Sequence, residues 1–198
     1  FVRELKRRAG MIPGVEIAAL AGSSPYRLAR RDTLLVQAAA SELGRSGLQA
    51  SAASEIVDGD YFSATGIALL GGRTFLAEET ESGRSVAIVN KTLADRLWPG
   101  ANAVGRQLKL GPNLAMHEVV GVVRDSKYSS LAEDPLPFVY TPLAGRNLGR
   151  VSVIVRTSVP PVTVVAPLRS LVRKLDPVVD IMRAGSARES LDESLWPT

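Results

Sequence analysis

The chain has 198 residues and a formal net charge of +4, and 45% of its residues are hydrophobic, a composition that excludes a disordered chain. It contains no cysteine, which excludes disulfides, thiol catalysis and cysteine-based zinc sites. Aromatic residues make up only 5% and the basic residues are scattered, so few bases could stack on this protein and we expect no nucleic-acid partner. The mild positive charge is compatible with a position near an anionic membrane surface.

The first third of the chain is predicted to begin with a helix and continue mainly in strands. Apolar residues at helical spacing predict an amphipathic helix over residues 1–12, which Pro13-Gly14 ends. A polar and basic loop is expected over residues 23–33 and a connection near Gly44 to Gly47. Strands are expected at three apolar runs: residues 15–24, 34–41 and 48–57.

The middle of the chain opens with an irregular segment, residues 58–75, that contains a short helix. Residues 77–84, "AEETESGR", predict a surface loop whose acidic face is solvated. Residues 85–90 read as a buried strand, and a helix follows at 91–98. Three residues delimit that helix: Asn90 as its N-terminal cap, and Pro99 and Gly100 at its end.

The last part of the chain predicts more strands and one long helix. The strands are residues 106–110, 117–123, 137–143 and 151–157. The helix spans 164–176, with Pro167 in its first turn, where no N–H bond is lost. "PVVDI" at 177–181 echoes "PGVEI" at 13–17, so we expect both to open a strand after a basic helix. Two related helix–strand units at the chain ends would then pack into one subdomain.

These elements predict an α+β fold in two parts. The first part is built from both chain ends, residues 1–75 and 149–198. The second is a smaller, inserted, mixed α/β subdomain, residues 76–148.

The motifs of catalysis are missing from the sequence. Glycines 66, 71 and 72 belong to neither a P-loop nor a dinucleotide-binding string, so tight turns explain them better. His117 is the only histidine, which excludes a site that needs two. A triad of His117 with Asp125 and Ser126 or Ser129 stays open, although no serine sits in a G-x-S-x-G elbow. We predict no catalytic, cofactor-binding or metal-binding residue.

Two polar or aromatic features allow both a structural and a functional interpretation. Asp58 and Asp60 could act in acid–base chemistry or hold calcium, but capping of the short helix that carries Tyr61 and Phe62 is the simpler role. Trp98, at a helix end, could be a binding hot spot or a cap over the core, and we favour the cap.

The order of the motifs is similar to a known family. "VDGDYFSATGIALLGGRTF" is followed by "SVAIVNKTLADRLWPGANAVGRQLKL", "HEVVGVVRDSKYSSL" and "PFVYTPL". This series resembles the periplasmic core domain of MacB-like ABC transporter permeases, which carry an FtsX-like membrane region. "IPGVEIAAL" and "LDPVVDIMRAGSARESLDESL" also match the family's edges, whereas the basic loop "SPYRLARRDT" has no family counterpart.

The family's pattern implies structural rather than chemical roles for the motif residues. Tyr61 and Phe62 pack on a short helix that Gly66 ends, and Gly72-Arg73 turn the chain into the second subdomain. We expect Arg73 to anchor that junction by hydrogen bonds to backbone or carboxylate oxygens. The expected structural residues are Tyr61, Phe62, Gly66, Gly72, Arg73, Phe75, Asn90, Trp98, Pro99, Gly100, Gly105, Gly121 and Asp125.

The resemblance also implies a function. Members are homodimeric permeases of the bacterial inner membrane, and the core domain, which includes a porter-like subdomain, faces the periplasm between the first two membrane helices. An ABC ATPase domain or subunit hydrolyses ATP in the cytoplasm. The periplasmic domain responds by moving and acts on substrate or a periplasmic partner protein, a mode called mechanotransmission that serves efflux or export.

Two other hypotheses stay open from the residues alone. One is a ligand-binding module that captures a lipophilic or peptide substrate in a pocket around Tyr61, Phe62 and Trp98. The other is a hydrolase that uses His117. Because the chain starts at Phe1 inside a helix and ends at "SLWPT", we expect it to be an excised part of a longer protein.

Overall fold

The computed structural model describes most of the chain: residues 1–23, 33–39, 48–82, 84–127, 134–143 and 149–189. The helices are α1 Val2–Ala9, α2 Tyr61–Thr65, α3 Ala77–Ser82, α4 Lys91–Leu97 and α5 Val162–Leu175. The strands are β1 Val15–Ala21, β2 Thr33–Ala38, β3 Gln49–Val57, β4 Leu69–Gly72, β5 Val86–Asn90, β6 Gln107–Leu110, β7 Ala115–Val123, β8 Phe138–Pro142 and β9 Ser152–Thr157. Across these ranges, every helix is too short or too polar to traverse a lipid bilayer.

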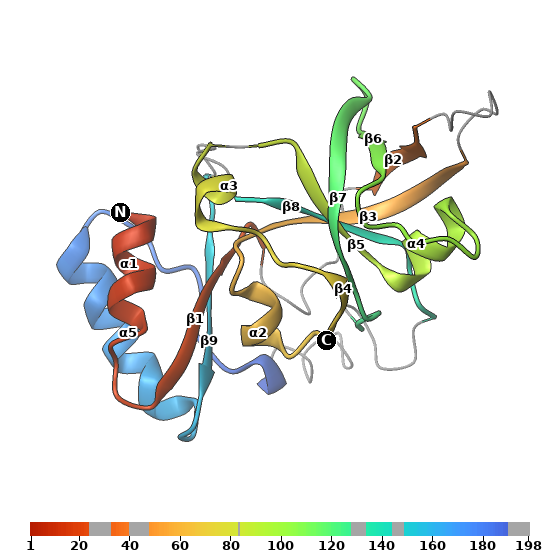
Figure 1. Ribbon diagram of the computed structural model, residues 1–198. Helices are drawn as coiled ribbons and strands as arrows, with labels where there is room; N and C mark the ends of the chain where they lie inside the picture. The colour runs from red at the N-terminus through yellow and green to blue at the C-terminus, as the bar shows by residue number, and fades with distance from the viewer. Residues whose placement is uncertain (24–32, 40–47, 83, 128–133, 144–148, 190–198) are drawn as a thin grey trace, which may run out of the picture.

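The strands form one nine-stranded sheet, and six of them close on themselves. The hydrogen-bonded order is β2-β6-β7-β5-β8-β3, and β3 pairs again with β2, which makes a six-strand ring (Figure 1). Two pairings in the ring are parallel, β3 with β8 and β5 with β7, and the others are antiparallel. Closure leaves none of these six strands with a free edge along the ring.

The interior of the six-strand ring is an apolar core. Because side chains alternate along a strand, Ala87 and Val89 of β5 point into this core while Val86 and Ile88 join a second cluster outside it. All six strands contribute, and α4 covers the core with Leu93. The other members are Val36, Ala38, Ala52, Ala94, Leu97, Trp98, Ala103, Leu108, Leu110, Val119 and Val139.

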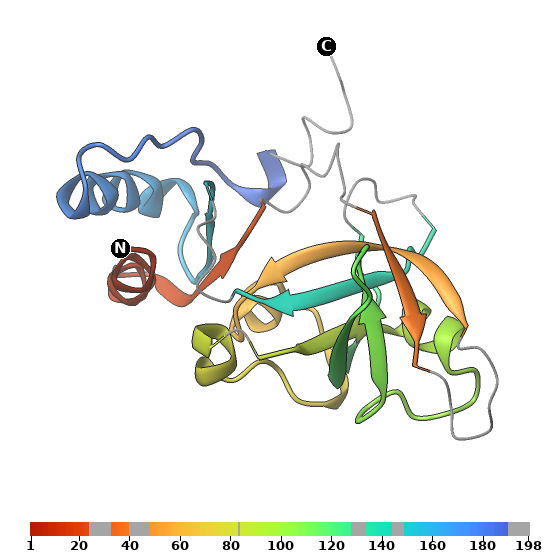
Figure 2. The same cartoon turned by 90° about the horizontal axis from the view of Figure 1, so that it is seen from above.

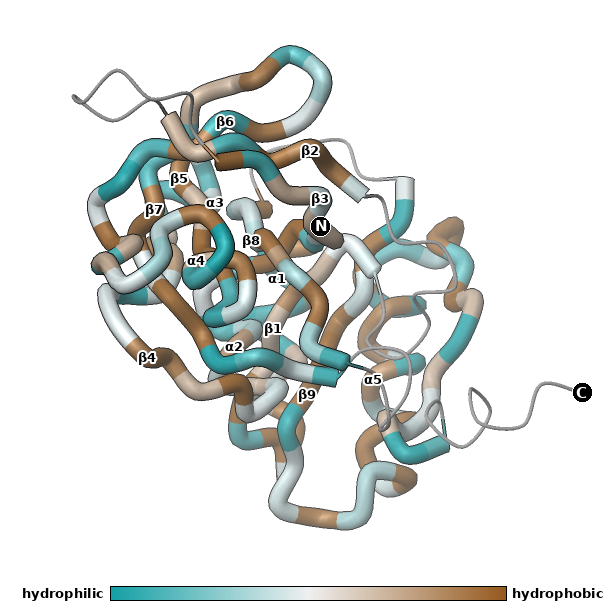
Figure 3. Tube along the Cα trace, turned by 90° about the vertical axis from the view of Figure 1, so that its right-hand side faces the viewer, coloured by the Kyte–Doolittle hydropathy of each residue, from teal (hydrophilic) through white to brown (hydrophobic). Residues whose placement is uncertain are grey.

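A second layer stands beside the ring. β1 and β9 pair antiparallel along their length, with α1 and α5 side by side on one face (Figures 1 and 2). The tube of α1 shows hydrophobic and hydrophilic residues together, as the sequence "VRELKRRA" requires for a half-buried helix (Figure 3). Its Leu5 and Ala9 are buried. α2 contacts both β1 and β9, and Ala21 of β1 pairs with Val57 of β3 to continue the sheet.

The structure confirms the α+β class and most of the expected elements, with bounds shifted by a few residues. The loop at 23–33 and the connection near Gly44 to Gly47 lie almost entirely outside the described residues. β4 is an additional strand inside the segment expected to be irregular.

The loop expected at 77–84 was wrong, because residues 77–82 form α3. The Glu79 carboxylate, at the third helical position, accepts the backbone N–H of Leu76, the residue before the helix, at 3.0 Å. This is half of a capping box, whose usual signature begins with serine or threonine. Leu76 stands at that place, so the sequence signal was hidden.

Two expectations for the last part of the chain were also wrong. α5 begins at Val162, two residues earlier than expected, so Pro167 lies inside the helix rather than in its first turn. Residues 177–181 form no strand, and Val178 is 89% exposed. At the start of the chain α1 is followed by β1, whereas at the end α5 is preceded by β9. The two chain ends therefore do not repeat the same order of elements.

Candidate functional site

An aromatic cluster joins the two layers. Tyr61 and Phe62 of α2 meet at 5.6 Å between ring centroids, with their planes at 88°. Phe62 lies 5.0 Å from Tyr140 of β8 and 6.5 Å from Phe75. Edge-to-face contacts of this kind are favourable beyond the area that they bury. The cluster holds α2, and with it the β1–β9 pair, against the outside of the six-strand ring.

The sequence prediction included only part of this cluster. Phe138 and Tyr140, whose rings lie 4.7 Å apart, were seen only as members of a strand. Both are fully buried, and their spacing of two puts them on one face of β8. The spacing alone predicts that the two rings share a face of the strand. It does not predict that α2 covers this face.

α2 ends as expected at Gly66, but its start is different. Gly66 has φ of 77°, the left-handed conformation that closes a helix, and its N–H donates to the Phe62 carbonyl. The prediction that Asp58 and Asp60 cap α2 was wrong, since Asp60 makes no capping hydrogen bond through its side chain. Both carboxylates instead lie 2.6 Å from the Lys6 ammonium on α1. The Asp60 carboxylate, at the N-cap position of α2, thus binds the nearby cation and not the helix N–H groups.

Asp58 is the buried partner in this ionic group. The residue is 3% exposed, and burial raises the pKa of its carboxyl, although the Lys6 ammonium opposes this effect. The Asp58 N–H donates to the Leu20 carbonyl of β1 at 3.0 Å, and the Asp58 side chain accepts the N–H of Asp60 at 3.2 Å. The end of β3 is thereby fixed to α1 and to β1.

Gly72 and Gly121 allow a close approach of backbones where β4 meets β7. The two residues are paired in register, and Gly72 has φ of 74°. A Cβ atom at Gly121 would lie 2.3 Å from the Arg73 carbonyl oxygen, and one at Gly72 would lie 2.2 Å from that of Val120. Only glycine fits at either position without moving the backbone.

Arg73 forms a two-pronged salt bridge with Glu79. Its guanidinium nitrogens lie 2.8 and 2.7 Å from the two carboxylate oxygens, and it also donates to the Thr74 carbonyl. The Glu79 side chain is 1% exposed, so the expectation of a solvated acidic face was wrong for this residue. Its hydrogen bonds with Arg73 lower the pKa of the Glu79 carboxyl. The bridge fixes α3 to the end of β4.

Asn90 and Asp125, both predicted as structural residues, meet at the junction of four elements. The Asn90 side-chain oxygen accepts the N–H groups of Leu93 in α4 and Phe138 in β8. Its amide nitrogen donates to Asp125 at 2.6 Å and to the Leu136 carbonyl at 2.7 Å. Asn90 is 2% exposed, so the network is buried where β5, α4, β7 and β8 converge.

Trp98 lies on the other side of the sheet from Tyr61 and Phe62. It is 8% exposed and belongs to the core inside the ring. The pocket expected around Tyr61, Phe62 and Trp98 is therefore wrong, because these side chains fill two separate clusters. Pro99 and Gly100 follow Trp98 at the end of α4, and Gly100 and Gly105, with φ of 69° and 83°, make open turns.

Among the described residues, the structure does not bring His117 together with Asp125 and Ser126, and Ser129, the other candidate serine, lies outside them. The histidine ring contacts the Ala115 carbonyl at 2.9 Å near the start of β7. Asp125 lies just beyond the other end of β7, about 26 Å away along an extended strand. Within the described ranges, no group of three or more histidine or acidic side chains could hold a metal ion.

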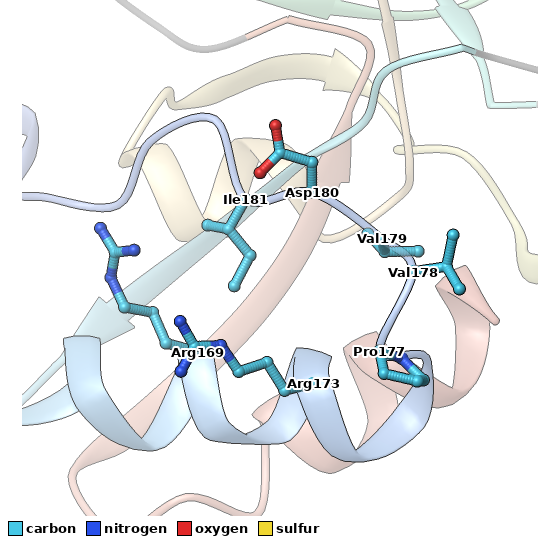
Figure 4. Close-up of a pocket in the computed structure, with 7 residues that line it drawn as sticks. All are labelled: Arg169, Arg173, Pro177, Val178, Val179, Asp180 and Ile181. Atoms are coloured by element: carbon cyan, nitrogen blue, oxygen red, sulfur yellow. The ribbon is translucent and has the colours of Figure 1, made fainter.

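A basic surface depression lies next to α5 (Figure 4). Arg169 and Arg173 project from the helix, and the segment with Asp180 and Ile181 passes over them. The depression has a volume of about 290 Å³ and is also lined by Pro177, Val178 and Val179. None of the predicted structural residues borders it.

Comparisons with known proteins agree on one kind of domain. A family model described as the MacB-like periplasmic core domain matches residues 5–180. The periplasmic region of MacB from Actinobacillus actinomycetemcomitans is similar in structure, with a TM-score of 0.59 and 14% identity over 87% of this chain and 73% of that one. None of the curated proteins matches the chain significantly in sequence.

Two further solved structures share the fold. One is the extracellular domain of the noncanonic ABC-type transporter YknZ from Gram-positive bacteria, with a TM-score of 0.56 and 18% identity over 88% of this chain and 84% of that one. The other is a domain of a putative permease from Porphyromonas gingivalis, with a TM-score of 0.54 and 15% identity over 84% and 68%.

Proposed function

Since the chain belongs to the MacB-like periplasmic core domain family and is thereby an extracytoplasmic domain of an ABC transporter permease, we propose that its work is mechanical coupling. ATP binding and hydrolysis in the cytoplasm would move this domain, which acts on substrate or on a partner protein outside the inner membrane. The domain itself carries out no covalent chemistry. A homodimeric permease, a periplasmic partner and an efflux or export direction are parts of the same proposal.

The observation that supports coupling best is the way in which the two layers are joined. α1 packs on β1 and on α5, and the β1–β9 pair meets the ring through α2, the aromatic cluster and the Ala21–Val57 pairing. Packed elements of this kind have discrete arrangements and transmit displacement rather than absorb it. The division into residues 1–75 with 149–198, porter-like, and 76–148, inserted, remains a prediction within this proposal. It divides the chain and not the ring, because ring strands come from both parts.

The test measures how far the six-strand ring lies from the membrane in the full-length permease, reconstituted with its ATPase. Gln107, exposed on β6, is replaced by cysteine and labelled with a donor dye, and lipid headgroups carry the acceptor. Coupling predicts that energy transfer changes when a non-hydrolysable ATP analogue is added and does not change with ADP. Identical transfer in both nucleotide states would contradict the proposal.

A second candidate is direct capture of a lipophilic or peptide substrate. The observation in its favour is an apolar depression of about 650 Å³ between the end of α1 and the start of α5. Met11, Ile12, Pro13, Val159 and Pro160 are among the residues that line it. Calorimetric titration with lipopeptides and macrolides tests capture, which predicts saturable heat that a Val159→Asp variant loses.

A further inference from the structure

Lys6 differs from the other cations of α1 in where it binds. Arg7 and Arg8 pair with Glu4 inside the same helix, and Arg3 pairs with Glu81 in a bridge that is exposed on both sides. Lys6 instead lies 2.6 Å from Asp58 and 2.6 Å from Asp60, outside its own helix. Its side chain is only 26% exposed, and that of Asp58 is 4% exposed.

The burial of Asp58 decides how much this ion pair matters. Exposed ion pairs contribute little, because water and salt screen them and two long side chains must be ordered. A buried carboxylate that loses its cation is left uncompensated, which is unfavourable. The ion pair of Lys6 with the buried Asp58 carboxylate therefore connects α1 to the end of β3 more strongly than the exposed Arg3–Glu81 bridge connects α1 to α3.

The residues next to Asp58 extend the connection into the ring. Gly59 packs directly on the segment before α3, since a Cβ atom there would lie 2.2 Å from the Phe75 carbonyl oxygen. Two residues earlier, Arg73 donates its backbone N–H to Val120 of β7 at 2.9 Å, and its carbonyl touches Gly121. Backbone contacts therefore run without a gap from the Asp58 turn to a central strand of the ring.

From this geometry we propose that Lys6, Asp58 and Asp60 form an ionic clamp that passes displacement of α1 to the six-strand ring, a role that rests on the proposed function. Lys6 is a positioning residue: it holds the Asp58-Gly59-Asp60 turn to α1. When α1 moves, the turn moves with it, and the contacts of Gly59 and Arg73 carry the movement to β7. Without the clamp, α1 stays joined to the β1–β9 pair but loses its direct connection to the ring.

The experiment compares two dye positions in the reconstituted full-length permease. Met11, 67% exposed just beyond α1, and Gln107 on the ring are replaced by cysteine one at a time. Without a further substitution, the non-hydrolysable ATP analogue should change the energy transfer to lipid headgroups from both dye positions. In Lys6→Met, the clamp predicts that the change at Met11→Cys persists and that the change at Gln107→Cys falls at least twofold. Arg8→Met removes a cation of the same helix that pairs with Glu4 inside α1, and it should leave both changes intact.

Each result separates the clamp from the function on which it rests. If Lys6→Met keeps the full change at Gln107→Cys, the clamp is wrong and coupling stands. If the wild type shows no change at either position, the proposed coupling fails and the clamp with it. Should Lys6→Met unfold, the double variant Lys6→Met with Asp58→Asn removes the buried charge together with the clamp, and it must show the same loss at Gln107→Cys.

Discussion

Asn90 shows how one buried amide can organise a domain. It caps α4 and binds the first residue of β8, so replacement by alanine removes both contacts. Loss of a cap costs about 1 kcal/mol, and an unsatisfied buried N–H costs about 1–3 kcal/mol. We expect Asn90→Ala to lower the free energy of unfolding by about 2–4 kcal/mol in urea titrations. Asn113→Ala, in an exposed turn, should change it by less than about 0.5 kcal/mol; equal effects at both positions would contradict the role given to Asn90.

The lowered pKa of the Glu79 carboxyl predicts how acid destabilises the domain. Arg73 holds the pKa of its carboxyl below the ordinary value of 4.5, so the folded state binds a proton less readily than the unfolded chain. The stability that this residue contributes is present above pH 4.5 and is lost as pH falls through the lowered pKa.

Unfolding in denaturant at a series of pH values between 6 and about 3 tests this sign. The decline of stability with acid should be shallower in Glu79→Gln, which cannot titrate, and also in Arg73→Ala, which lacks the partner. If the free energy of unfolding falls with pH equally in the wild type and in Glu79→Gln, the Arg73–Glu79 bridge does not contribute to acid sensitivity.

At the scale of elements, the approach of β4 to β7 depends on Gly121. A methyl group there meets the Arg73 carbonyl at 2.3 Å, and backbone on both sides prevents relaxation. Overpacking of this kind costs up to about 3 kcal/mol, which in a domain of this size lowers the melting temperature by roughly 6–12 °C. Gly149→Ala is the matched control, because nothing lies within 4 Å of the added atom. A melting temperature of Gly121→Ala equal to that of the control would refute the close approach.

At the scale of the whole molecule, the ring combines strands from both parts of the expected division. β2 and β3 come from residues 1–75, and they pair with β6 and β8 from residues 76–148. We expect a fragment of residues 76–148 to remain unfolded by circular dichroism, because it lacks two ring strands and exposes two edges. A fragment of residues 33–148, with all six strands, should unfold cooperatively. Cooperative unfolding of residues 76–148 alone would instead show that the insertion has its own core.

The local elements and the family could be predicted from the amino-acid sequence. Apolar spacing predicted α1, β5 and α4, and the N-terminal cap at Asn90 was visible because its signal is contained in a few neighbouring residues. The order of the motifs predicted the permease domain, which the match over residues 5–180 confirms.

Which distant residues meet could not be predicted from local patterns. Lys6 and Asp60 are 54 residues apart, so the sequence assigned the carboxylates to the nearest helix instead of to α1. The burial of Glu79, the exposure of residues 177–180 and the closure of the ring likewise depend on which segments pack together. Periodicity gives the face that a segment buries, but the partner of that face is set by long-range packing, which no local pattern encodes.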